Sequence, residues 1–206
     1  MPILVMNCDH WIGFHLVERL LELGYQVHGV AEEEKDDYLT HFFGRNSRFA
    51  FVTSTEEIVY DACFMISEIK ENQTIQTEQM IMIDDRYQFK KVENKHAHII
   101  RPPLLYGEWM PMTKDSVYYA DRWINIHSEQ FKKDGVYIKN FVDSLLQLMH
   151  IKNLPSYLNI YTKLHSKAFD SLHHTIYIRE SGNDREKVKK VIAHHEKIMR
   201  FKNLKL

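Results

Sequence analysis

The turn at residues 7–10 is where this chain could bind phosphate, because it separates an apolar segment from a segment with helical periodicity. Residues 2–6 form the apolar run typical of a buried parallel strand, and apolar residues between 11 and 23 recur at helical spacing before Gly24. In a strand–turn–helix unit the free N–H groups of the first helical turn favour an anionic group. A dinucleotide phosphate site is therefore the first chemistry to test.

Histidine is the other residue type that could do chemistry, since the chain has 13 histidines and only 7 glycines. His96 and His98 alternate along an expected strand and so share one face, whereas the pairs at 173–174 and 194–195 are adjacent and poorly placed to bind one ion. The sequence contains no Cys-x-x-Cys and no His-Glu-x-x-His spacing. We therefore expect no metal site.

An alternation of strands and helices must position these residues. Hydrophobic patterning, with Gly, Pro and Asn at the boundaries, separates the elements. Beyond the first strand, strands are expected at residues 25–30, 48–52, 60–66, 79–83, 96–100, 157–161 and 175–178. Helices are expected at residues 11–23, 141–151 and 183–203.

The composition is that of a globular protein with one sizeable core: 206 residues, 44% hydrophobic and 27% charged. A net charge of -1 gives the molecule no long-range preference for nucleic acid. No apolar run approaches the roughly 18 residues that span a bilayer, and the N-terminus does not resemble a signal peptide, so we expect a cytoplasmic protein. Cys8 and Cys63 are then expected to be reduced core thiols.

Three segments resemble the extended short-chain dehydrogenase/reductases, the NAD-dependent epimerase/dehydratase family. Residues 3–30 resemble the family's first strand, helix and second strand, above all over residues 15–27. Residues 101–107, Arg-Pro-Pro-Leu-Leu-Tyr-Gly, resemble the end of its sixth strand, and residues 135–143 resemble a later strand and helix start. The resemblance implies an α/β fold: a Rossmann-like doubly wound parallel sheet with helices on both faces and a reduced C-terminal substrate lobe.

The resemblance also locates a cofactor site, although two of the family's three glycines are replaced. Asn7 and His10 stand at the first two positions and only Gly13, the helix-packing glycine, remains. Asn7 tolerates the left-handed conformation, whereas the His10 ring would stand where the phosphates approach the backbone. The cofactor-binding positions implied by the resemblance are Asn7, His10, Trp11, Ile12, Gly13, Glu32 and Pro102.

The family's catalytic residues are replaced or displaced. Asp84 stands where the family's fifth strand ends in Ser or Thr, which contacts the substrate. A Tyr-x-x-x-Lys pair occurs at Tyr87 and Lys91, and the family uses such a pair as acid/base and as the lysine that lowers the phenol's pKa. Here the pair follows the strand almost at once and the helix that should carry it is missing or very short, so we interpret it as a chance match.

We expect a single Rossmann-like domain over residues 1–206, with the core at 1–107 and 135–180, the reduced lobe at 108–134 and a basic helix at 183–203. The lobe is rich in aromatic residues, a pattern more typical of a core or interface than of a ligand cage. The basic helix is interpreted as an amphipathic helix with a solvated face; the alternative is a docking helix for an acidic partner, nucleic acid or a membrane surface.

The leading hypothesis is a non-catalytic pseudoenzyme, a shortened and degenerate epimerase/dehydratase-like protein that uses its scaffold for binding, regulation or assembly. It predicts no cofactor. The first alternative is an active NAD(P)-dependent reductase, epimerase or dehydratase, in which Tyr87 is the acid/base, Lys91 its partner and Asp84 the substrate contact. The second is an assembly protein that acts through the aromatic segment and the basic helix. A homo-oligomer or protein partner is possible in each case, a membrane span is not expected, and nucleic acid is not the expected partner.

Overall fold

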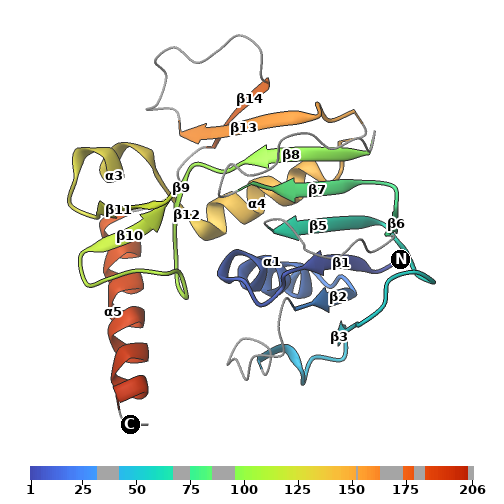
Figure 1. The fold of residues 1–206 in the computed structure, drawn as a ribbon, viewed down its shortest axis with the longest axis horizontal. Coiled ribbons are helices and arrows are strands. Elements are labelled where there is room, and N and C mark those ends of the chain that lie inside the picture. Colours follow the sequence, from blue (N-terminus) through green and yellow to red (C-terminus); the bar gives the residue numbers. More distant parts are fainter. Residues whose placement is uncertain are drawn as a thin grey trace.

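The fold is built on an eight-stranded sheet in which all neighbouring strands are parallel (Figure 1). The computed structural model describes residues 1–31, 42–66, 75–84, 96–151, 153–162, 174–178 and 184–203. In spatial order the strands are β14 (His174–Ile178), β13 (Tyr157–Thr162), β8 (Ala97–Arg101), β7 (Met80–Ile83), β5 (Ala62–Ile66), β1 (Ile3–Met6), β2 (Val27–Val30) and β3 (Phe49–Phe51).

The strand order reverses at β1. This strand pairs with β2 on one side and with β5 on the other, so that Ile3 lies opposite both Val27 and Ala62. In open α/β sheets such a reversal creates a crevice at the carboxyl ends of the strands, where ligands bind. The predicted Rossmann-like parallel sheet is confirmed, and its described strands coincide with the expected segments to within a few residues.

Two helices, α1 (Trp11–Glu22) and α4 (Ile138–Leu148), contact one another and lie on the same face of the sheet (Figure 1). Each buries an apolar stripe at helical spacing, as the sequence pattern predicts: Ile12, Leu16, Val17 and Leu20 in α1, and Phe141, Val142, Leu145 and Leu146 in α4. Residues 67–74 and 85–95, which connect β5 to β7 and β7 to β8, lie outside the described residues, so the expectation of helices on both faces stays a prediction for the second face.

The central strand is buried on both faces. Ile3 and Val5 belong to the main core, which includes α1, whereas Leu4 and Met6 contact Tyr60 and Cys63 on the opposite face. Full burial of each such side chain contributes about 1.5–3 kcal/mol. Cys8 and Cys63 are buried and unbonded to one another, which confirms the prediction of core thiols.

A small lobe extends beyond the carboxyl ends of the strands, at the left of Figure 1. It begins at β9 (Leu104–Tyr106) and ends at β12 (Gly135–Tyr137), which pair in parallel. Between them lie the hairpin of β10 (Ser116–Tyr119) and β11 (Arg122–Asn125) and the short helix α3 (Glu129–Asp134). The terminal helix α5 (Asp184–Asn203) runs beside this lobe. A separate pair, β4 (Val59–Tyr60) and β6 (Gln76–Thr77), completes the described strands.

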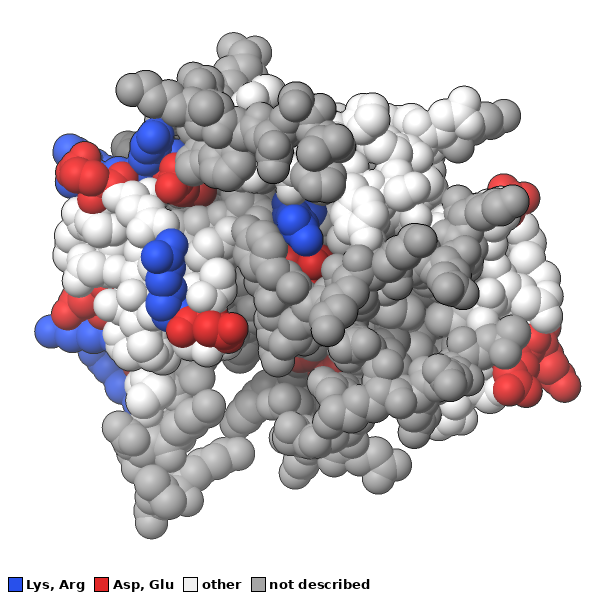
Figure 2. All heavy atoms as spheres, turned by 45° about the horizontal axis from the view of Figure 1, so that its top comes forward, with Lys and Arg blue, Asp and Glu red and all other residues white. Residues whose placement is uncertain are grey.

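Charges of both signs are interspersed on the surface. On the face shown in Figure 2 the described Lys and Arg side chains lie scattered among Asp and Glu rather than in one basic patch. Within the described ranges, no helix combines the length and apolar character needed to cross a membrane. The same ranges contain no group of three His, Cys, Asp or Glu side chains placed to hold a metal ion.

Candidate functional site

The turn after β1 is fixed by Asn7. Its backbone is in the left-handed region, with φ of 56°, and its carbonyl accepts from the N–H of His10 at 3.0 Å. The side-chain Nδ2 donates to the carbonyl of Ile66, the last residue of β5, at 2.7 Å. Asn7 therefore makes the tight turn and also ties together the ends of two neighbouring strands.

His10 occupies the start of α1. Its backbone is extended, as expected of an N-cap, and its Nδ1 accepts from the N–H of Ile12 at 3.4 Å. The backbone carbonyl of His10 accepts from the N–H of Phe14 at 2.8 Å. Because the ring uses an N–H group of the first helical turn, it stands where an anion would bind at the end of a helix.

Gly13 has the packing role predicted for it. A Cβ at this position would overlap the carbonyl oxygen of Asn7 and lie 3.0 Å from the Cα of Cys8. Only glycine therefore lets α1 approach the turn this closely. The glycine at position 13 is therefore one that the packing of α1 against the turn requires.

A cavity of about 80 Å³ remains between the start of α1 and the lobe. Its walls are residues 10–12, residues 102–103 and the hairpin residues 118–120, among others. Small-molecule sites usually measure about 300–1,000 Å³. The cavity bounded by these described residues lies below that range.

The predicted site residues divide into three sets. Asn7, His10, Trp11, Ile12 and Gly13 lie together at the turn, and Pro102 lines the same cavity.

Asp84 follows β7 and is 1% exposed, with its Oδ2 3.7 Å from Nε of Arg101. It therefore lies against a cation of the neighbouring strand β8. Tyr87, Lys91 and Glu32 lie outside the described residues, so their assignments stay predictions.

A second polar cluster, which the sequence did not reveal, is centred on Glu108 just after β9. Glu108 is 8% exposed, and its two carboxylate oxygens accept from the Tyr137 hydroxyl at 3.0 and 2.9 Å. Lys190 of α5 places its ammonium 3.0 Å from Oε1. Burial opposes the charged form, but the bonds from Lys190 and Tyr137 hold the pKa of Glu108 below its ordinary value. A buried, charged carboxylate therefore joins β12 to the terminal helix.

Aromatic contacts support the same junction. The Trp109 ring lies edge-on to His194 of α5, with centroids 4.6 Å apart, and 5.8 Å from the Phe14 ring of α1. Lys187 lies over the Tyr137 ring at 5.5 Å. Burial, followed by the charge of Glu108, raises the pKa of Tyr137 above its ordinary value. Tyr137 therefore stays a neutral hydrogen-bond donor.

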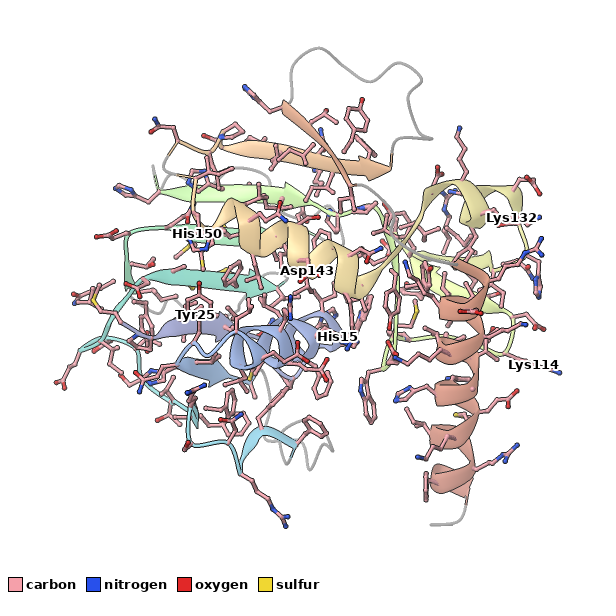
Figure 3. All side chains as sticks on the ribbon, turned by 180° about the vertical axis from the view of Figure 1, so that it is seen from behind. His15, Tyr25, Lys114, Lys132, Asp143 and His150 are labelled. Atoms are coloured by element: carbon pink, nitrogen blue, oxygen red, sulfur yellow. The ribbon has the colours of Figure 1, made fainter. Side chains whose placement is uncertain are left out.

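The seam between α1 and α4 carries a third set of charges. His15 from α1 and Asp143 from α4 lie on these neighbouring helices (Figure 3). Arg19 donates to Asp143 at 2.7 Å, and Lys139 lies 3.3 Å from Glu18. These groups line a cavity of about 200 Å³. The sequence did not predict this cluster, because the pairs Arg19–Asp143 and Glu18–Lys139 join distant parts of the chain.

No protein-family model matches the chain, and no curated protein matches it. Solved structures do resemble it. Pal from Bacillus thuringiensis has a TM-score of 0.62 at 11% identity, over 96% of this chain and 100% of that one. dTDP-glucose 4,6-dehydratase from Bacillus anthracis, solved with NAD, has a TM-score of 0.60 at 9% identity, over 96% and 97%. UDP-glucose 4-epimerase from Thermotoga maritima, solved with UDP-glucose, has a TM-score of 0.57 at 12% identity, over 97% and 100%. At these identities the likeness is one of fold: the chain has the Rossmann-like architecture of the epimerases and dehydratases.

Proposed function

We propose that the protein is a non-catalytic, shortened relative of the extended epimerases and dehydratases, which uses the Rossmann scaffold for binding, regulation or assembly. The observation that carries the proposal is the His10 cap. Its ring accepts from the Ile12 N–H, at the place where a cofactor phosphate would otherwise bind.

Two further observations support it. The cavity beside the cap, about 80 Å³, is several times smaller than an ordinary ligand site. Asn7 uses its side chain to join β1 to β5, so its amide contributes to the fold at a position where the family has a bare glycine. The turn therefore has a structural role: it connects the ends of β1 and β5.

The test is calorimetric titration of the full chain with NAD⁺, NADH, NADP⁺ and NADPH in turn. We expect no saturable heat up to millimolar cofactor, because the phosphate position is filled by the chain itself. Saturable binding of any of the four at micromolar concentration would contradict the proposal and favour an active NAD(P)-dependent enzyme.

A matched variant, His10→Gly, separates the ring from the rest of the site. Glycine is itself an acceptable N-cap and costs only a few tenths of a kcal/mol, so the variant should remain folded. Binding by the variant but not by the native chain would identify the His10 ring as the block. If neither the variant nor the native chain binds a cofactor, Asn7 and the lobe also prevent binding.

A further inference from the structure

The hydrogen-bond partner of one ring nitrogen fixes the proton on His15. Its Nε2 lies 3.0 Å from the backbone carbonyl oxygen of Glu108. A carbonyl oxygen can only accept, so Nε2 must carry a hydrogen and donate it. In a neutral ring the other nitrogen, Nδ1, would then be a bare acceptor.

That second nitrogen faces a carboxylate. The His15 side chain is 4% exposed, and Nδ1 lies 3.6 Å from Oε2 of Glu18. Among the described residues, Nδ1 has no hydrogen-bond partner. A neutral His15 would therefore direct a lone pair at a negative oxygen in a buried place, which is unfavourable. A proton on Nδ1 turns the same geometry into a charge-assisted attraction.

Glu18 is charged under all ordinary conditions. Its contact with His15, opposed by burial and helped by Lys139, lowers the pKa of Glu18 to about 2. Lys139 lies 3.3 Å from the same oxygen, but 45% of its side chain is exposed, whereas His15 is buried. The partner that Nδ1 needs is therefore present whenever the ring is protonated.

We propose that His15 is a protonation-dependent latch for the terminal helix. With a proton on both nitrogens it bridges the Glu18 carboxylate and the Glu108 carbonyl, and so holds the loop at Glu108 and Trp109 that contacts α5. Loss of the Nδ1 proton replaces this bridge by repulsion and loosens the docking of α5.

The loop at Glu108 and Trp109 transmits the effect because the side chains of these two residues both contact α5. Glu108 accepts from Lys190, and Trp109 lies against His194. Trp109 has φ of 66°, a left-handed conformation that costs a non-glycine residue about 1–2 kcal/mol. Such a backbone persists only where its surroundings hold it, and the His15 bridge lies at the preceding residue.

His194 sets a lower limit to the pH range. Burial lowers the pKa of His194, and the neighbouring His15, Lys197 and Lys190 act in the same direction against the opposing charge of Glu108. Docked α5 therefore favours neutral His194. Protonation of His194 weakens docking, whereas a proton on Nδ1 of His15 strengthens it.

The experiment is a pH series, from about 5 to about 8, on the uniformly ¹⁵N-labelled full chain. Long-range ¹H–¹⁵N spectra report the protonation of each His15 ring nitrogen, and amide exchange at Val191 and its neighbours in α5 reports docking. As the pH falls, we expect Nδ1 to gain a proton while Nε2 stays protonated throughout. Once the pH rises and the Nδ1 proton is lost, amide exchange in α5 should be about tenfold faster. That factor corresponds to the free energy of one charge-assisted hydrogen bond.

Two variants make the test specific. Glu18→Gln keeps the size of the side chain and removes the charge, so it should abolish the tenfold change; His194→Gln should remove only the loss of docking at low pH. The proposal is overturned if Nδ1 stays unprotonated across the series, if α5 exchange does not follow His15, or if Glu18→Gln keeps the full pH dependence. Amides of β1 serve as the control for global unfolding.

Discussion

The hydrogen bond from Asn7 to Ile66 and the left-handed backbone of Asn7 allow one quantitative prediction. In Asn7→Ala two contributions are lost together. The buried carbonyl of Ile66 loses its 2.7 Å donor, which costs about 1–3 kcal/mol. Alanine must also adopt φ near 56°, which costs about 1–2 kcal/mol. The expected loss in the free energy of unfolding is therefore about 2–5 kcal/mol.

Asn7→Gly separates the two contributions. Glycine loses the hydrogen bond but adopts the left-handed conformation freely, so only the first cost, together with a small entropic term, applies. We expect Asn7→Ala to be less stable than Asn7→Gly by about 1 kcal/mol. For a chain of this length that difference corresponds to about 2–4 °C in Tm.

The assay is urea unfolding followed by far-UV circular dichroism, with the slope of the transition compared between variants to confirm that each unfolds in the same way. Asn46→Ala is the matched control, because Asn46 also bonds a backbone N–H, that of Arg48 at 3.0 Å, but at an exposed turn. It should cost about 0.5 kcal/mol. Equal stability of the alanine and glycine variants at position 7 would refute the argument from backbone strain. A native-like Asn7→Gly would refute the argument from the hydrogen bond.

Three further predictions concern single features. Gly13→Ala should destabilise the protein by about 1–3 kcal/mol in the same assay, because the new methyl group meets the backbone of Asn7 and Cys8; a neutral result would mean that α1 can shift freely. Glu18→Gln should reduce the loss of stability between pH about 4.5 and about 2. A carboxyl whose pKa is lowered on folding stabilises the protein above its ordinary pKa of 4.5, and this contribution is lost as the pH falls to about 2. An unchanged loss of stability in this pH range would argue against the His15 and Lys139 contacts. Burial raises the pKa of Cys8 and Cys63 to about 12, and at Cys8 the charge of Asp9 adds to this effect. Neither thiol should therefore react with a thiol reagent at about pH 8 in the folded protein, and both should react after unfolding. Rapid labelling of the folded chain would contradict their burial.

The elements that carry a local pattern were predictable from the sequence. The first strand, α1 and the left-handed Gly24, with φ of 87°, follow from apolar spacing and from the residue that ends a helix. The left-handed Asn7 also matches its prediction. These features depend on residues close together in the chain, which is why the sequence contains them.

The start of α4 was predicted less well. The apolar pattern indicated Phe141, whereas the helix begins at Ile138, directly after the strand residue Tyr137. Tyr137 is the N-cap but makes no side-chain capping bond, so no Ser, Thr, Asp or Asn marks the boundary. Val136, Tyr137 and Ile138 run across the boundary between strand and helix as one short apolar segment, and periodicity cannot divide it.

The Glu108 cluster could not be predicted because its members are far apart in the sequence. Tyr137 lies 29 positions from Glu108, and Lys190 is on the terminal helix. A single glutamate after a strand is normally solvated, and only the arrival of β12 and α5 buries it. His10 is different: the predicted helix start at Trp11 already put it at the N-cap, where its ring could have been expected to bond the first turn.

The parallel pairing of β9 with β12 also bears on how this fold could change over evolution. Because Leu104 lies opposite Gly135 and Tyr106 opposite Tyr137, the chain leaves the body and returns to it at adjacent points. Lengthening or shortening a loop whose ends are already held together changes its closure entropy only slowly, by about 0.6 kcal/mol per doubling. A change in the length of the lobe therefore leaves the register of the large sheet in place, although Val117, Ile124 and Phe131 of the lobe belong to the main core.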